Sequence, residues 1–150
     1  MISLGVSREV QTTVSSLWPV IGKFSALPEW FPNISHFECD GDAPGAERRI
    51  TIGPFVITQR LLEQDDAMHM TKYQVTTGPG MTPETGFIVT ITVADIGGGR
   101  ARIDWSAQLD ALPSMLPPGS EAAFIQRTER NYNDALDHFE ALINAAPILH

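Results

Sequence analysis

Four polar side chains fall at positions that the surrounding pattern assigns to an apolar interior. Arg48, Gln59 and Tyr73 each alternate with apolar neighbours along a predicted strand, and Tyr132 lies on the apolar stripe of a predicted helix. Such groups can polarise a carbonyl or transfer a proton. A filled core has little use for several polar tips, because each must find a hydrogen-bond partner. We therefore predict an internal cavity in which a ligand or water supplies those partners.

Large apolar side chains are expected to form the walls of this cavity. Apolar walls with a few placed polar groups are typical of small-molecule sites. Each wall residue taken singly is more often a core residue, so the prediction depends on the set. Loops at Gly53-Pro54 and at 78–81 would form a gate, with glycines supplying mobility. The predicted ligand-binding residues are Trp30, Phe31, Met81, Thr85, Phe87, Trp105, Phe124 and Thr128.

Candidates for general acid or base catalysis are weaker. His36, Glu38 and Glu84 lie on predicted strands, where a slip of one residue moves a side chain from the interior to solvent. None of the 4 histidines stands at ligand spacing with another histidine or a cysteine, so we predict no metal site and no cofactor. Cys39, the only cysteine, is expected to be a buried, inert thiol.

Seven strands are predicted from alternating apolar and polar residues that are separated by Gly, Pro and Asp turns. Short connections between consecutive strands are typical of an antiparallel meander. The strands are expected at Ile2–Val10, Ile34–Asp40, Glu47–Ile52, Phe55–Gln64, His69–Thr77, Glu84–Ala94 and Arg100–Asp110.

Two short helices are predicted after the first strand. The first can be capped by Thr13, Ser15 or Ser16, and the second spans 26–31. A long helix is predicted from Ser120 to about Ala145; it would be roughly 39 Å long, enough to cross the concave face of a twisted sheet. The predicted fold is α+β, in one domain over 1–150. The apolar stripe of the long helix comprises Phe124, Thr128, Tyr132, Ala135, Leu136, Phe139, Leu142 and Ile143.

Charge and composition limit the classes of molecule that the protein is expected to bind. The formal net charge of -8 opposes binding to nucleic acid and gives no attraction to anionic lipid. The N-terminus lacks the features of a signal peptide, and no apolar run reaches membrane-spanning length. We expect a cytoplasmic protein, monomeric or homodimeric, without nucleic-acid partners or membrane insertion. Its expected partner is a small hydrophobic molecule.

An ordered series of short matches resembles the SRPBCC superfamily, which includes START domains, birch-pollen-allergen-like proteins and bacterial polyketide cyclase/dehydrase proteins. The resemblance implies a helix-grip fold, a curved sheet of about seven strands around a long C-terminal helix. Family members often carry an acidic residue where this chain has Gln59, which weakens any acid/base role there. The matches are Leu17-Trp18, the run Ala26-Leu27-Pro28-Glu29-Trp30-Phe31-Pro32, Gly45-Ala46-Glu47-Arg48, Gln59-Arg60-Leu61, Tyr73-Gln74-Val75 with Gly78-Pro79, and Asp104-Trp105-Ser106.

Two functions are compatible with this sequence. The first is a polyketide cyclase/dehydrase-like lyase or isomerase that orients an apolar or aromatic substrate for cyclisation, dehydration or a related addition or elimination. The second is a non-catalytic carrier or sensor of a lipid or aromatic molecule. A stress-response or interaction module with an incidental cavity is a third alternative. A converging acid and base inside the cavity would distinguish the first from the second, and the sequence identifies no such pair.

Overall fold

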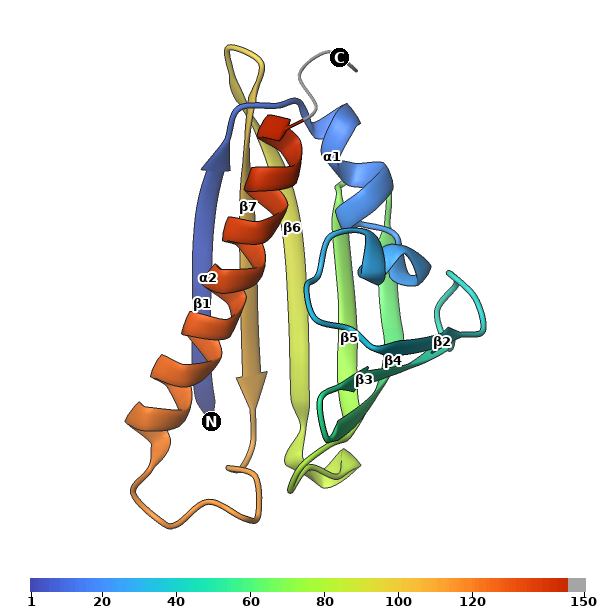
Figure 1. Cartoon of the computed structure of the whole chain (residues 1–150). Helices are drawn as coiled ribbons and strands as arrows, with labels where there is room; N and C mark the ends of the chain where they lie inside the picture. Colours follow the sequence, from blue (N-terminus) through green and yellow to red (C-terminus); the bar gives the residue numbers. More distant parts are fainter. Residues whose placement is uncertain (146–150) are drawn as a thin grey trace.

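The seven predicted strands form one antiparallel sheet in the computed structural model, which describes residues 1–145. The strand order is β1-β7-β6-β5-β4-β3-β2. Figure 1 shows the curvature of the sheet and the helices on its concave side. The strands are β1 (Ile2–Val10), β2 (His36–Cys39), β3 (Glu47–Ile52), β4 (Phe55–Asp65), β5 (Met70–Thr77), β6 (Phe87–Gly97) and β7 (Arg100–Leu109). The helices are α1 (Val14–Ile21), η1 (Phe24–Glu29), η2 (Pro83–Thr85) and α2 (Glu121–Ala145).

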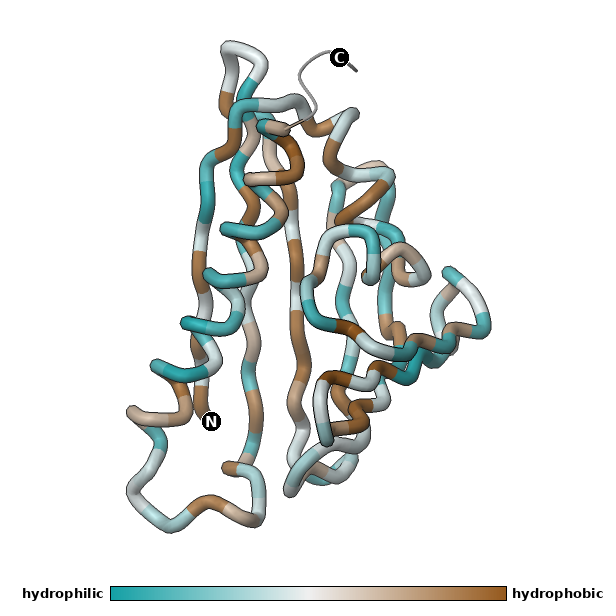
Figure 2. The backbone as a smooth tube through the Cα atoms, in the orientation of Figure 1, coloured by the Kyte–Doolittle hydropathy of each residue, from teal (hydrophilic) through white to brown (hydrophobic). Residues whose placement is uncertain are grey.

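The inner face of β6 and β7 carries the alternation that the sequence predicts. Ile91 of β6 pairs with Trp105 of β7, and both side chains are buried. The residues directly before and after Ile91 and Trp105 along each strand are at least partly exposed. β6 is coloured as mostly hydrophobic in Figure 2. One face of the sheet is therefore packed and the other faces solvent, which confirms the α+β, helix-grip prediction.

α2 lies across β1 and β7 and is fixed there by charged groups (Figure 1). The guanidinium of Arg8 on β1 forms ion pairs with Asp137 at 2.8 Å and Glu140 at 3.0 Å on the helix. The backbone N–H of Gly5 donates to the Glu129 carboxylate at 2.9 Å. These contacts satisfy part of the free edge of β1, which would otherwise be open to another strand.

The apolar stripe of α2 is narrower than predicted. Phe124, Ala135, Leu136 and Phe139 are buried, whereas Leu142 is 43% exposed. Inclusion of Leu142 in the stripe was therefore wrong: the next residue, Ile143, is half-buried against the core, so Leu142 lies outside the edge of the stripe. The inner side of α2 between its two buried ends carries Tyr132, which contacts the sheet.

α1 begins where the sequence predicts. Thr13 is its N-cap, and the Thr13 hydroxyl accepts a hydrogen bond from the backbone N–H of Ser16. Gly22 ends the helix in a right-handed conformation, and a Cβ at this position would overlap the indole ring of Trp18. Gly22 is thus required by the close approach of Trp18 to the backbone. The following turn is η1, which begins two residues earlier than the predicted helix over 26–31.

Three predicted strand starts were wrong by one to three residues. The predicted strand from Ile34 begins at His36. His69 has a φ of 53° and belongs to a turn, so β5 begins at Met70. Glu84 lies in η2, and Gly86, with a φ of 64°, turns the chain into β6 at Phe87. A left-handed residue breaks an extended strand, and alternation alone does not reveal it. No helix within residues 1–145 combines the length and apolar character needed to cross a membrane.

Candidate functional site

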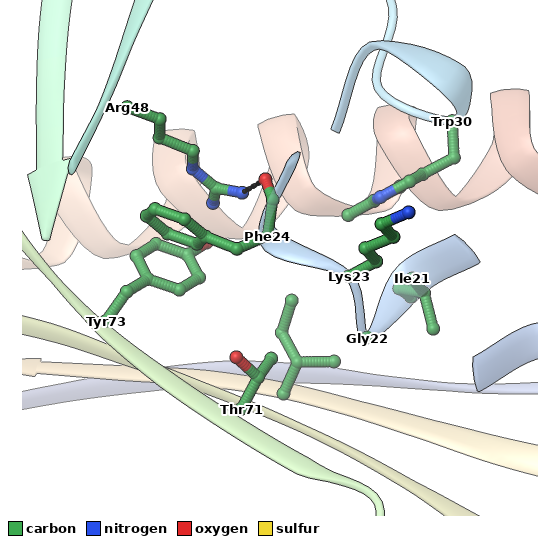
Figure 3. Close-up of a pocket in the computed structure, with 9 residues that line it drawn as sticks. Ile21, Gly22, Lys23, Phe24, Trp30, Arg48, Thr71 and Tyr73 are labelled. Atoms are coloured by element: carbon green, nitrogen blue, oxygen red, sulfur yellow. Dashed lines mark hydrogen bonds between the residues drawn. The ribbon is translucent and has the colours of Figure 1, made fainter. Parts of the chain in front are cut away.

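Arg48 is a cation inside the sheet-helix interface. Its side chain is 4% exposed. Nε donates to Gln59 Oε1 at 2.7 Å, across the β3–β4 pair, and Nη1 donates to the backbone carbonyl of Phe24 at 2.8 Å. The guanidinium carbon lies 4.0 Å from the ring centroid of Phe24 and 4.7 Å from that of Tyr73. Figure 3 shows Arg48, Phe24 and Tyr73 converging from three different elements.

The positive charge of Arg48 has no close anionic partner. No carboxylate of residues 1–145 lies within ion-pair distance of it, and Gln59 is neutral. Burial lowers the pKa of Arg48 to about 10, while Tyr73, Cys39 and Asp42 act in the opposite direction. The guanidinium therefore stays protonated at neutral pH. An arginine in a bidentate pair would be neutralised locally, whereas this one is free to attract negative charge.

The aromatic residues predicted as cavity walls contact one another instead. Trp105 stacks on Tyr132 with ring centroids 4.0 Å apart and an interplanar angle of 10°. Trp30 meets Trp105 edge-on at 5.3 Å, and Phe31 meets Trp105 at 6.2 Å. Phe139 of α2 lies 5.6 Å from Trp30. We call Trp30, Phe31, Trp105, Tyr132 and Phe139 the aromatic cluster. It joins α2 to the sheet at the centre of the molecule.

A hydrogen-bond donor in the aromatic cluster lacks an acceptor. Trp105 is 2% exposed, and its indole Nε1–H makes no hydrogen bond of acceptable geometry within the described part of the chain. The indole is near two hydroxyls, since it lowers the pKa of Tyr73 and of Tyr132. Burial outweighs this effect and raises the pKa of Tyr73, and it raises the pKa of Tyr132 well above 10. Both phenols are therefore neutral at physiological pH.

Donors outnumber acceptors in this region. Arg48 supplies a cation, Trp105 an unused N–H, and Tyr73 and Tyr132 two protonated hydroxyls. We call Arg48, Tyr73, Trp105 and Tyr132 the donor cluster. A carbonyl, enolate or carboxylate oxygen is the chemical group that complements it.

Residues 1–145 do not enclose the open interior that the sequence predicts. The cavity beside Arg48 offers about 10 Å³ to the centre of a water molecule, far below the several hundred Å³ of a drug-sized site. The reason is steric. Alternation along a strand predicts which side chains face the interior, but it does not predict how much of the interior they fill. Trp30 and Trp105 are large enough to meet across the interface.

Apolar side chains remain partly exposed at the end of the sheet where β3 turns into β4. Phe55 is 51% exposed although it shares the inner side of β4 with buried Leu61. Figure 2 shows hydrophobic residues at this hairpin. Met81 is half-buried in the neighbouring loop, which is joined to the β7–α2 connection because Ser114 N–H donates to the Gly80 carbonyl at 2.9 Å. These segments include both predicted gate loops.

The family comparison accords with this arrangement. The sequence model of the family described as polyketide cyclase / dehydrase and lipid transport matches residues 1–144. The chain belongs to this family. Among curated proteins, none matches the chain.

Solved structures share the fold of this family member at low identity. The protein XoxI from Bacillus cereus is 22% identical, with a TM-score of 0.82 over 100% of this chain and 99% of that chain. A protein from Thermobifida fusca is 23% identical, with a TM-score of 0.79 over 93% of this chain and 91% of that one. The di-domain aromatase/cyclase BexL, from the BE-7585A biosynthetic pathway, is 15% identical with a TM-score of 0.74; 96% of this chain matches 47% of BexL.

The acid/base candidates of this polyketide cyclase/dehydrase family member do not reach its interior. His36 and Glu38 have side chains 64% and 61% exposed and lie 3.6 Å apart on the outer side of β2. Glu84 is exposed in η2, where the Thr82 hydroxyl lowers its pKa. Within residues 1–145 no Asp, Glu or His is buried, and no group of three His, Cys, Asp or Glu could hold a metal ion.

Four other predicted ligand-binding residues are not members of the donor cluster, although one of them, Thr128, lies one helical turn before Tyr132. Thr85 is buried, but its hydroxyl accepts the backbone N–H of Thr82 at 3.0 Å and so closes the capping box of η2. Phe87 and Phe124 form an edge-on pair at 6.1 Å, which anchors the start of α2. Thr128 is half-buried on the same helix.

Three features of the site escaped the sequence. Cys39 is half-buried rather than buried, and its thiol donates to the Gly41 carbonyl at 3.2 Å. The Phe24 carbonyl that accepts from Arg48 lies in a turn, where no pattern reveals which backbone group points inward. Thr71 is buried two residues before Tyr73, and strand parity could have identified it.

Proposed function

We propose that this protein binds a small hydrophobic or aromatic molecule that carries a carbonyl or enolate oxygen, and that it catalyses cyclisation, dehydration or a related addition or elimination of that molecule. The observation that carries the proposal is the donor cluster: a buried, protonated Arg48 without a carboxylate partner and an unused Trp105 N–H, with Tyr73 near both. The family to which the chain belongs, and its likeness in fold to an aromatase/cyclase, support the same reaction class.

The proposed role of Arg48 is to stabilise negative charge that develops on the ligand oxygen. Ring closure between two keto groups and loss of a hydroxyl beside a ketone both pass through an enolate-like state, which forms here when a water molecule or hydroxide from solvent takes the proton from carbon. A fixed cation in a region that excludes water stabilises such a state more than water does. Gln59 would act as a positioning residue, because its amide oxygen holds Arg48 Nε. Tyr73 and Tyr132 would act as proton donors, since their raised pKa keeps them protonated.

Binding requires the aromatic cluster to open. The space beside Arg48 holds about one water molecule, so a ligand must displace the contact between Trp105 and Tyr132. The half-buried apolar residues near Phe55 and Met81 mark the side from which we propose it enters, because an apolar ligand loses least water there. Movement of loops at a binding site on the microsecond to millisecond scale is common among enzymes.

A second function, a non-catalytic carrier, is favoured by one observation. Proton abstraction from carbon needs a base, and none of the described residues supplies a buried carboxylate or histidine. A carrier would use the donor cluster only to orient its ligand. The two functions differ in whether the bound molecule reacts faster than it does in solution.

Acetophenone and ethylbenzene test the binding step, because both carry a two-carbon chain on a phenyl ring and only acetophenone has a carbonyl oxygen. We expect acetophenone to bind the native protein roughly tenfold more tightly, as one hydrogen bond to a charged group contributes. Arg48→Met should reduce this preference to near unity while ethylbenzene affinity stays the same. Arg49→Met, on the outer face of β3, is the matched control and should keep the preference. An equal preference in the native protein and Arg48→Met would refute the role of Arg48.

1-Phenylbutane-1,3-dione distinguishes the enzyme from the carrier. Exchange of deuterium into the carbon between its two carbonyls reports enolisation. The proposed enzyme accelerates this exchange, and Arg48→Met abolishes the acceleration. Tight binding with an unchanged exchange rate would assign the carrier function instead.

A further inference from the structure

Thr71 carries a buried hydroxyl without a partner. It lies on β5, two residues before Tyr73 and on the same face of the strand. Its side chain is 4% exposed, and Oγ1 makes no hydrogen bond within the described part of the chain. A buried hydroxyl is nearly always hydrogen-bonded, to protein or to ordered water.

The small cavity beside Arg48 reaches this hydroxyl. Its lining combines Thr71 with Arg48 and Tyr73 on one side and with Gly22 and Lys23 on the other, as Figure 3 shows. Its volume of about 10 Å³ is close to the minimum that one water molecule needs. A cavity of this size with several polar groups is suited to water, whereas a cavity lined only by apolar groups would stay dry.

The same cavity adjoins a groove on the surface. This groove has a volume of about 390 Å³ and is lined by Trp18, by Gln64 and by the exposed carboxylates Asp42 and Asp66. Gly22, Lys23 and Phe24 line both spaces. Gly22 has no side chain to separate them, and the side chain of Lys23 is exposed and free to move. The turn after α1 therefore lies between the surface groove and the small cavity beside Arg48.

We infer that the small cavity is a binding site for one water molecule, held by Thr71 Oγ1 beside Arg48 and Tyr73, and that this water exchanges with solvent through the groove at 22–24. The turn after α1 is remote from the apolar end near Phe55, where we propose that the ligand enters. The interior would then have an aqueous route separate from its apolar one.

An aqueous route would let water formed in a dehydration leave the interior. Only this role of the route rests on the proposed function. A dehydration removes a hydroxyl and a neighbouring hydrogen from carbon, forms a carbon–carbon double bond and releases both groups as one water molecule. That water is formed beside the ligand, which blocks the apolar end. A second passage lets it leave without release of the product. The water site itself is a property of the free protein.

The water site can be tested on the full chain without any ligand. Magnetic cross-relaxation between water and the Thr71 and Tyr73 amides should reveal a long-lived water, and Thr71→Val should abolish the signal. If the hydroxyl holds water, Thr71→Val should lower the melting temperature by about 2–4 °C, because the water loses a partner. Thr90→Val, on the outer face of β6, is the control. If the cavity is dry, the native protein should give no such signal, and Thr71→Val should leave the melting temperature unchanged or raise it. That result would overturn the water site.

The route has its own test. Lys23→Trp places a bulky ring over the shared boundary and should lengthen the residence time of the water, measured by deuterium relaxation dispersion. Lys23→Gln changes the same position without filling the groove and should leave that time unchanged. An unchanged residence time in Lys23→Trp would show that the water leaves elsewhere and overturn the inferred route. Neither experiment depends on whether a ligand binds.

Discussion

Replacing Gln59 by leucine should destabilise the protein, and replacing Arg48 by methionine in the same chain should restore the lost stability. In the proposed function Arg48 binds the ligand, and the burial of its charge lowers the free energy of unfolding. Gln59→Leu removes the acceptor from Arg48 Nε and leaves the cation buried with less compensation. The double variant Arg48→Met/Gln59→Leu removes the cation and its acceptor together, and apolar groups fill the same volume.

The magnitude follows from the structure. A hydrogen bond to a buried charge contributes about 2–3 kcal/mol, so Gln59→Leu should lower the free energy of unfolding by about that amount. The lowering of the Arg48 pKa to about 10 corresponds to a cost of about 3 kcal/mol for the charged form. Removing Arg48 recovers this cost but leaves the Phe24 carbonyl without its donor, which costs about 1–2 kcal/mol. The double variant should therefore be at least as stable as the native protein.

Urea unfolding at pH 7 measures these changes, with equal slopes required for a valid comparison. Arg49 and Thr58 form the next cross-strand pair on the outer face, so Arg49→Met/Thr58→Leu is the matched control. It should change the free energy of unfolding by less than about 1 kcal/mol. If the Arg48→Met/Gln59→Leu variant loses more than about 2 kcal/mol, Arg48 stabilises the fold and the reasoning is wrong.

Three further predictions follow from local geometry. Gly22→Ala should lower the free energy of unfolding by about 2 kcal/mol, because the new methyl overlaps Trp18, whereas Gly78→Ala, which has room for a methyl, should change it little; equal effects would contradict the packing. Tyr73 and Tyr132 are the only tyrosines, and burial raises the pKa of both, so phenolate absorbance should be nearly absent at pH 10 in the folded protein and half-developed in urea. Above pH 10 the folded protein keeps phenolic protons that the unfolded chain loses, so the free energy of unfolding should fall as the pH rises further. A midpoint of phenolate absorbance at pH 10 in the folded protein would contradict this prediction. Tyr132→Phe should slow the exchange of 1-phenylbutane-1,3-dione without weakening the binding of acetophenone, and an unchanged rate would remove Tyr132 from the mechanism.

The sheet could be predicted from the sequence because burial on one face imposes a period of two on the residues. Phe87 to Val93 carry this period except at Ile88, and Ile103 to Leu109 carry it throughout; both strands were predicted, although β6 begins at Phe87 rather than at Glu84. The strand starts near His69 and Gly86 were missed, because a positive φ depends on the turn and leaves little trace in hydropathy. The exposure of Leu142 beside half-buried Ile143 depends on how α2 is rotated against the sheet, which helical periodicity does not define to a single residue.

The candidate site was predictable in composition but not in shape. Parity placed Arg48, Gln59 and Tyr73 inside, and the register then set Arg48 directly opposite Gln59. Register requires knowledge of the turns, which sequence patterns define poorly. Whether an interior is hollow depends on how far the side chains from facing elements reach. The contact between Trp105 and Tyr132 closes a space that the same sequence pattern would equally allow to stay open.

Several expectations stay predictions. They are the cytoplasmic location, the monomeric or homodimeric state, the lack of nucleic-acid partners, and the roles of the individual site residues. The assignment of 1–150 to a single domain and the expected lack of a cofactor also stay predictions.

The indole N–H resonances of the 3 tryptophans test the central claim most directly, because they report on the donor cluster and on a site outside it at once. Trp18 Nε1–H already donates to Asp66 at 2.9 Å outside the donor cluster, whereas Trp105 Nε1–H lacks an acceptor. On titration with acetophenone, a downfield shift of the Trp105 signal that saturates with binding is the predicted result, with Trp18 unmoved and with no such shift for ethylbenzene. If acetophenone binds while the Trp105 signal keeps its position, the ligand oxygen does not enter the donor cluster and the account is contradicted.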